Sequence, residues 1–141
     1  MKIRYLGYNE VLDIYREQIN KFGGFGAVRD NNALLSVIVN PQREFAGREL
    51  YPTIASKAAI VVYSLIKNHP FVDGNKRTAF IWGRTFLRLN GYDVGALQKY
   101  YEIIVKIAKD EVKQEDVFEW FEVSVALLSD IKEKVKEKNR C

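Results

Sequence analysis

The most apolar segment of the chain, residues 53–68, sets the strongest limit on how the protein folds. Its apolar side chains cover most of the circumference of a helix; they are Ile54, Ala55, Ala58, Ala59, Ile60, Val61, Val62, Tyr63, Leu65 and Ile66. A helix that is apolar nearly all round needs neighbouring elements on every side. It is also shorter than the roughly 20 apolar residues that span a bilayer. We therefore expect this segment in the middle of a helical bundle.

The rest of the chain also reads as mostly helical. Apolar residues at i, i+3 and i+4 spacing predict further helices over residues 9–21, 31–40, 75–89, 96–109 and 115–136, and residues 131–140 are expected to be a solvated helix tail. A chain of 141 residues without internal repeats can bury one core. We predict an all-α fold, a compact bundle of about six helices forming a single domain over residues 1–141.

Two segments interrupt the helical pattern. Residues 22–26, Phe-Gly-Gly-Phe-Gly, are predicted to be a turn that ends the first helix, since no strand precedes them and no Gly-Lys-Ser/Thr follows. Residues 41–52 are predicted to form a loop or small hairpin. A long loop ahead of a helix pair is often functional, although a surface connection without a role is the alternative.

Charge and cysteine content limit the environment and the partners. The net charge of +4 is compatible with nucleic acid, but no motif of a nucleic-acid-binding family is visible, so direct binding is not expected. The single cysteine, Cys141, excludes an intrachain disulfide and fits a reducing cytoplasm. The N-terminus shows no signal-peptide pattern, and no membrane association is expected.

The candidate chemistry lies in residues 69–80, His-Pro-Phe-Val-Asp-Gly-Asn-Lys-Arg-Thr-Ala-Phe, which contain the only histidine of the chain. The sequence predicts a loop that enters a helix: Gly74 allows φ > 0, and Asn75 can cap the helix or adopt a left-handed conformation. Helix N-termini attract anions, and Lys76 and Arg77 add full positive charges there. This arrangement predicts a phosphate site.

Two further residues of the same stretch complete a possible reaction site. Asp73 can bind a divalent cation such as Mg²⁺, which prefers carboxylate and phosphate oxygens. His69 can accept a proton from an attacking hydroxyl. A base, a metal ligand and a phosphate cradle so close together indicate phosphoryl or nucleotidyl transfer. Arg84 and Arg88, farther along the predicted helix, are interpreted as a solvated face or a partner surface.

Residues 69–79 resemble the signature of the Fic/Doc superfamily, and Lys76 together with Thr78-Ala79 resembles its Doc (death-on-curing) branch. The likeness extends upstream to Val28-Arg29-Asp30, to Pro41-Gln42 and to Leu50-Tyr51-Pro52, and so spans most of the chain.

The resemblance implies a Fic-like fold and a transfer from ATP to a protein hydroxyl with Mg²⁺ as cofactor. In that case His69 is the catalytic base, Asp73 the Mg²⁺ ligand, and Gly74, Asn75 and Arg77 an anion-binding nest. The segment 41–52 corresponds to the flap that aligns the target by strand-like pairing. Its candidate docking residues are Arg43, Phe45, Gly47 and Leu50.

Two positions depart from the Fic adenylyltransferase pattern. Lys76 replaces a glycine, so a side chain and a point charge occupy the space in which phosphates approach the backbone. Phe80 replaces a second arginine. In Doc-type proteins these features accompany ATP bound in the reverse sense and transfer of its γ-phosphate, with elongation factor Tu as target. The resemblance therefore implies a kinase, the toxin of a toxin–antitoxin pair, whose groove an antitoxin covers with a helix.

Two alternatives remain open from the sequence. One is a Fic-type AMP transferase (adenylyltransferase) on the same scaffold, which the position of the transferred label would distinguish. The other is a non-catalytic helical binding module, which predicts no ATP binding.

Overall fold

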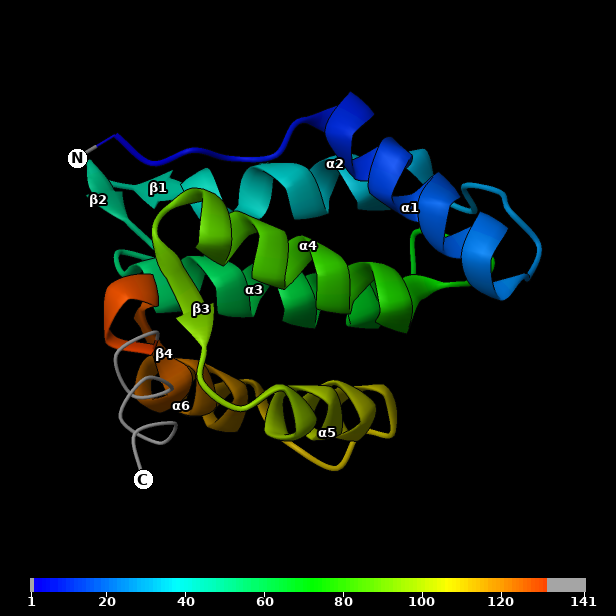
Figure 1. The fold of residues 1–141 in the computed structure, drawn as a ribbon. Helices are drawn as coiled ribbons and strands as arrows, with labels where there is room; N and C mark the ends of the chain where they lie inside the picture. The colour runs from blue at the N-terminus through cyan, green and yellow to red at the C-terminus, as the bar shows by residue number, and fades with distance from the viewer. Residues whose placement is uncertain (1, 132–141) are drawn as a thin grey trace, which may run out of the picture.

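Helix α3 (Ile54–Asn68) lies at the centre of the fold, which a computed structural model describes for residues 2–131. Eleven of its 15 residues are buried. In Figure 1, α3 and α4 (Asn75–Leu89) run antiparallel in the middle, with α1 (Tyr8–Phe22) and α2 (Asn31–Val39) on one side. Helices α5 (Leu97–Ala108) and α6 (Gln114–Ser124) cover the other side. This arrangement confirms the predicted all-α bundle of about six helices.

Local capping explains where α3 begins and ends. The Thr53 hydroxyl accepts a hydrogen bond from the Ser56 N–H (2.9 Å), and the Ser56 hydroxyl accepts one from the Thr53 N–H (3.0 Å). This reciprocal pair satisfies N–H groups that a helix start leaves free. At the other end His69 adopts a left-handed conformation (φ 52°), directly before Pro70.

Among the described residues, no helix has the length and apolar character that crossing a bilayer requires.

A small hairpin connects α2 to α3, as predicted for residues 41–52. After the 3₁₀ turn η1 (Asn40–Gln42), strands β1 (Glu44–Phe45) and β2 (Arg48–Glu49) pair antiparallel. The turn residues Ala46 and Gly47 both have positive φ values, 51° and 77°. A two-residue hairpin turn needs this backbone geometry because it matches the twist of the strands.

The predicted last helix, residues 115–136, is wrong at residues 125–127, whereas residues 128–131 are helical again. Helix α6 ends at Ser124, and β4 (Val125–Leu127) pairs antiparallel with β3 (Tyr92–Val94), a strand that was not predicted. The apolar spacing of residues 117–128 fits a helix, but the backbone of residues 125–127 bonds to a strand far away in the sequence instead. Tertiary pairing here outweighs local propensity. The expected tail, residues 132–140, and Cys141 lie outside the described residues.

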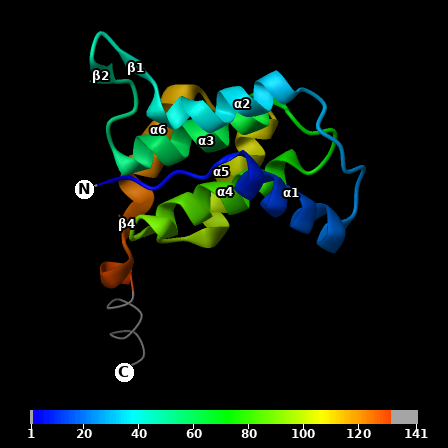
Figure 2. The same cartoon turned by 90° about the horizontal axis from the view of Figure 1, so that it is seen from above.

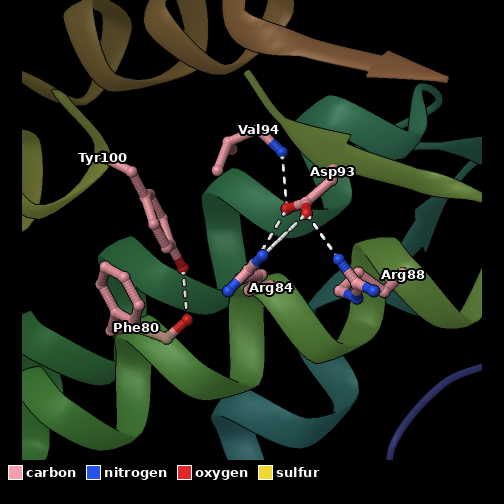
Figure 3. Close-up of polar contacts among 6 residues, drawn as sticks. All are labelled: Phe80, Arg84, Arg88, Asp93, Val94 and Tyr100. Atoms are coloured by element: carbon pink, nitrogen blue, oxygen red, sulfur yellow. Dashed lines mark hydrogen bonds and ion pairs between the residues drawn. The ribbon is translucent and has the colours of Figure 1, made fainter. Parts of the chain in front are cut away.

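Arg84 and Arg88, interpreted from the sequence as a solvated face or a partner surface, are partly exposed but also form ion pairs within the chain. Both guanidinium groups bind the carboxylate of Asp93 on β3, which is only 4% exposed (Figure 3). The shortest contacts are 3.2 Å from Arg84 Nε to Oδ1 and 2.9 Å from Arg88 Nη1 to Oδ2. The Val94 N–H donates a further hydrogen bond to this carboxylate (2.8 Å). These contacts fasten β3 to the C-terminal half of α4.

Helix α4 also packs closely against α5 near its middle. The Tyr100 hydroxyl donates a hydrogen bond to the Phe80 carbonyl oxygen (2.7 Å), as Figure 3 shows. Complete burial raises the pKa of Tyr100, so this phenol stays protonated and able to donate. A Cβ atom at Gly83 would lie 2.6 Å from both the Tyr100 hydroxyl and a Val62 methyl group. Glycine is therefore required at this crossing.

We predict that Asp93→Ala destabilises the fold by about 1–3 kcal/mol. The variant leaves two arginines without their common partner, and because both are partly solvated the loss falls below that of a fully buried pair. Urea unfolding measures the change, with Glu102→Ala, which removes an exposed carboxylate, as the control. Equal midpoints for the two variants would contradict the structural role of Asp93.

Candidate functional site

A pocket of about 500 Å³ lies where the end of α3, the start of α4 and the end of α5 meet. The residues that line it are Ile66, Lys67, His69, Val72, Asp73, Gly74, Asn75, Lys76, Arg77, Ile107, Ala108 and Asp110. All six residues predicted from the 69–77 stretch as base, metal ligand or phosphate contacts are among them. The structure thus brings the predicted groups to one cavity.

The backbone of His69 is held at the end of α3. The residue is exposed and lines the pocket. Its backbone N–H donates a hydrogen bond to the Leu65 carbonyl oxygen (3.0 Å). Its own carbonyl oxygen accepts a hydrogen bond from Arg29 Nε (2.6 Å). Hydrogen bonds thus hold the N–H and the carbonyl group on the two sides of the His69 side chain, which lines the cavity.

Arg29 was not recognised as a supporting residue from the sequence. Besides His69 it binds the Asn68 carbonyl oxygen through Nη2 (2.8 Å), so its charge meets the last carbonyl groups of α3, where a helix favours cations. The neighbouring residues Val28 and Phe71 form an antiparallel bridge. Only the motif Val28-Arg29-Asp30 marked this segment in the sequence, because the contact joins residues about 40 positions apart.

Phe71 anchors the loop between α3 and α4, as its apolar side chain suggests. The residue is 0% exposed, and its ring stacks on Tyr15 of α1 with 3.8 Å between centroids and 6° between planes. The Tyr15 hydroxyl is hydrogen bonded to the Ala27 carbonyl oxygen (3.3 Å). Burial raises the pKa of Tyr15, so the phenol stays protonated as a donor. One aromatic pair thus joins α1 to the loop of the pocket.

Asn75 fastens the same loop from the other side. Its Oδ1 accepts from the Phe71 N–H (3.1 Å) and its Nδ2 donates to the Phe71 carbonyl oxygen (2.9 Å). Asn75 is the first residue of α4 and is 5% exposed, while Gly74 before it has the predicted positive φ (83°). The Asn75 side chain therefore shapes the loop, and the left-handed or capping conformation considered for it is occupied by Gly74.

Asp73 and Arg77 project beside one another from the loop and the first turn of α4. The Asp73 carboxylate accepts a hydrogen bond from the Phe25 N–H (2.8 Å), and Arg77 Nη2 donates to the Gly23 carbonyl oxygen (3.0 Å). The described residues contain no cluster of three or more His, Cys, Asp or Glu side chains that alone could hold a metal. One carboxylate beside a helix N-terminus fits Mg²⁺, which is often held by one or two carboxylates plus substrate phosphates.

Two lysines add positive charge at the rim. Lys76 is exposed in the first turn of α4, and Lys67 near the end of α3 forms an ion pair with Asp110, the residue that closes the pocket after α5. The first N–H groups of a helix also lack partners within it. Together these groups favour a ligand that carries several negative charges.

The four predicted flap residues do not lie at this pocket. Figures 1 and 2 show the β1–β2 hairpin and the loop of residues 69–74 at opposite ends of α3. The hairpin is fastened there by the buried Lys57, whose Nζ donates to Glu49 Oε1 (3.0 Å) and to the Pro41 carbonyl oxygen (3.1 Å). His69 follows Lys57 by twelve positions along α3, which is about 18 Å at a rise of about 1.5 Å per residue.

The surroundings of the individual flap residues follow from their places in the hairpin and the turn before it. Arg43 Nε donates to Asn40 Oδ1 (2.7 Å), which turns it back toward η1. Phe45 is 76% exposed and Leu50 is 49% exposed. Gly47 serves the hairpin turn. The predicted role of these four residues in docking the target stays a prediction, with the hairpin before the start of α3 and His69 at its end.

Comparisons with known proteins identify relatives of the chain. The model of the Fic/DOC family matches residues 5–87. The chain is similar to Toxin Doc of Mycolicibacterium smegmatis, with 44% identity over 75 residues, which is 53% of this chain and 58% of that toxin's length. It is also similar to Protein kinase doc of Escherichia phage P1, with 26% identity over 115 residues, covering 82% of this chain and 90% of that protein.

We predict that Asn75→Ala loosens the pocket loop. The change leaves the N–H and the carbonyl oxygen of Phe71 without their side-chain partner, at a cost of about 1–3 kcal/mol for each buried group that stays unsatisfied. Hydrogen exchange of the Phe71 amide should become faster, and urea unfolding should show the loss of stability. Lys76→Ala, an exposed change in the same helical turn, is the control. An unchanged Phe71 exchange rate would contradict the role of Asn75.

Proposed function

Since the chain belongs to the Fic/DOC family, within its Doc branch, we propose that it is the toxin of a toxin–antitoxin pair and transfers the γ-phosphate of ATP to a protein hydroxyl. The observation that carries the proposal is one pocket in which His69, Asp73 and Arg77 meet at the N-terminus of a helix. The target is a Ser or Thr hydroxyl of a translation factor, elongation factor Tu by family resemblance, and its modification halts protein synthesis.

The chemistry assigns each group a task. The target hydroxyl oxygen forms a bond to the γ-phosphorus, and its proton passes to the imidazole of His69, the catalytic base. The bond from the γ-phosphorus to the bridging oxygen breaks, and its electron pair leaves on the β-phosphate oxygen of ADP. His69 suits this task because its side chain is exposed to the pocket while its backbone is held by Arg29.

The phosphates are proposed to bind at the start of α4. The N–H groups of its first turn, the Arg77 guanidinium and the Lys76 ammonium supply positive charge there. Asp73 would hold Mg²⁺, which neutralises phosphate charge and orients the transferred group when bound. Gly74 supports this cradle because a positive φ at the helix start is strained for other residues.

Transfer of AMP by the same pocket is the second candidate. Two features favour the kinase instead. Lys76 occupies the position where a glycine would let phosphates approach the backbone. The position of the second phosphate-binding arginine is taken by Phe80, whose ring packs against Tyr100 with 4.6 Å between centroids. A non-catalytic binding module is disfavoured because base, carboxylate and arginine are all present at one cavity.

The antitoxin is proposed to cover an adjacent groove of about 550 Å³. Its lining contains the apolar side chains of Phe22, Phe80, Ile81, Tyr101 and Ile104. Phe22 and Tyr101 are 66% and 55% exposed. Arg77 and Lys76 lie at the edge of this groove, so an amphipathic antitoxin helix laid into it would lie beside the phosphate site.

We predict that ATP labelled at the γ-phosphate transfers its label to one protein of a bacterial translation extract with Mg²⁺, and that ATP labelled at the α-phosphate does not. Gel autoradiography followed by mass spectrometry identifies the protein and the modified residue. Label from the α-phosphate would establish AMP transfer and overturn the kinase assignment.

The His69→Ala variant serves as the matched control for the same assay. It should lower the transfer rate by about 10²- to 10⁴-fold, the usual contribution of a general base, while ATP binding and the unfolding midpoint stay close to those of the parent. Transfer at the parental rate would remove His69 as the base.

We further predict that Lys76→Gly shifts the labelled product toward AMP transfer, because the change frees the space in which phosphates approach the backbone. Lys76→Ala, which removes the charge but keeps a Cβ atom, should shift the product less. The measurement is the ratio of α-label to γ-label in the target band. Equal ratios in the parent and both variants would contradict this account of ATP orientation.

A further inference from the structure

The segment at the end of α1, residues 22–25, contacts Asp73 and Arg77, two charged groups of the candidate phosphate site. The sequence predicts only a turn for this segment. Gly23 does end α1, with a positive φ (79°). Tyr15 holds the stretch just beyond it, because its hydroxyl is hydrogen bonded to the Ala27 carbonyl oxygen (3.3 Å). The turn thereby contacts the loop of residues 69–74, which lies about 50 positions later in the chain.

The contact with Asp73 is made by the backbone. The Phe25 N–H donates a hydrogen bond to Asp73 Oδ2 (2.8 Å). At Gly24 the φ angle is +111°, and a Cβ atom there would lie 3.1 Å from the Asp73 Cβ. A carboxylate has two oxygens, and this bond uses one of them. The contact therefore fixes the rotation of the carboxylate and leaves an oxygen for a cation.

The same segment also restricts Arg77. Its Nη2 donates to the Gly23 carbonyl oxygen (3.0 Å), and its guanidinium lies 5.5 Å from the centre of the Phe22 ring. A guanidinium has five N–H donors, so these contacts restrict its position without using up its capacity for phosphate. A cation over an aromatic face is a further attraction.

We propose that Gly24 and Phe25 are positioning residues of the Mg²⁺–phosphate site and act through Asp73. This inference rests on the proposed function and deepens it. Partners that orient a metal-binding side chain usually matter about 10- to 100-fold for metal affinity. At position 24 only glycine combines this φ angle with the close approach to Asp73 without strain. The backbone N–H of Phe25 supplies the hydrogen bond that orients the carboxylate.

An inhibitory role of this segment predicts the opposite change in Mg²⁺-dependent nucleotide binding. If the segment were a brake that keeps Asp73 and Arg77 away from nucleotide, loosening it would tighten Mg²⁺-dependent binding. If it positions them, loosening it weakens that binding. The sign of the change therefore separates the two roles.

The test uses isothermal titration calorimetry of the full chain with a non-hydrolysable ATP analogue, once with Mg²⁺ and once with EDTA. The readout is the ratio of the two affinities, which reports the metal contribution and not the general integrity of the pocket. We expect Gly24→Ala to lower this ratio by about 10-fold or more. Gly91→Ala is the matched control, because Gly91 also has a positive φ (+87°) but nothing within 4 Å of an added Cβ.

A second pair of variants keeps the test decisive if Gly24→Ala does not fold. Phe25→Pro removes the N–H that binds Asp73, whereas Phe25→Ala keeps it and removes only the ring, which is 68% exposed. We expect a lower Mg²⁺/EDTA affinity ratio for the proline variant than for the alanine variant. Equal ratios in the two, or a higher ratio in the proline variant, would overturn the positioning role.

The outcome also separates this proposal from the proposed function. If the parent protein binds the analogue in a Mg²⁺-dependent way and Gly24→Ala behaves like Gly91→Ala, only the positioning role is overturned. If the parent shows no Mg²⁺-dependent binding, the proposed function fails and the positioning role fails with it.

Discussion

The ring of Phe71, wholly buried and stacked on Tyr15 at a centroid distance of 3.8 Å, holds the loop on which the rest of the candidate site depends. Burying an aromatic side chain of this size stabilises a fold by about 1.5–3 kcal/mol relative to leaving it exposed. Asn75 adds two hydrogen bonds to the Phe71 backbone. The loop is thus held from within the core, while His69 and Asp73 on either side of Phe71 remain exposed to the pocket.

The supports of the pocket come from the N-terminal part of the chain, although the chemical groups lie in the middle. Arg29 binds the carbonyl groups at the end of α3, and the backbone of Gly23 and Phe25 binds Arg77 and Asp73. This division has a physical reason. A loop between two antiparallel helices has few internal partners for its polar groups, and a second segment laid against it supplies them.

Five cationic residues of the central helices fall into two sets with different tasks. Lys57, Arg84 and Arg88 are engaged with carboxylates that fasten the hairpin and β3 to the central helices. Lys76 and Arg77 lie at the helix start beside the pocket, where an anionic ligand would gain from them. Charge by itself does not separate the sets, because Arg77, Arg84 and Arg88 lie on the same helix. Only their neighbours in space do.

The sequence by itself determined most of the helices and the grouping of the site residues. An apolar α3 must be central, and a base, a carboxylate and two cations close together on one loop and helix start stay close in any fold that keeps that loop. What only the tertiary structure decided were contacts between distant segments. Asp93 paired with Arg84, residues 125–127 became a strand on β3, and residues 22–25 came to Asp73. Spacing along the chain carries local periodicity, whereas these contacts depend on which surfaces the packed helices bring together.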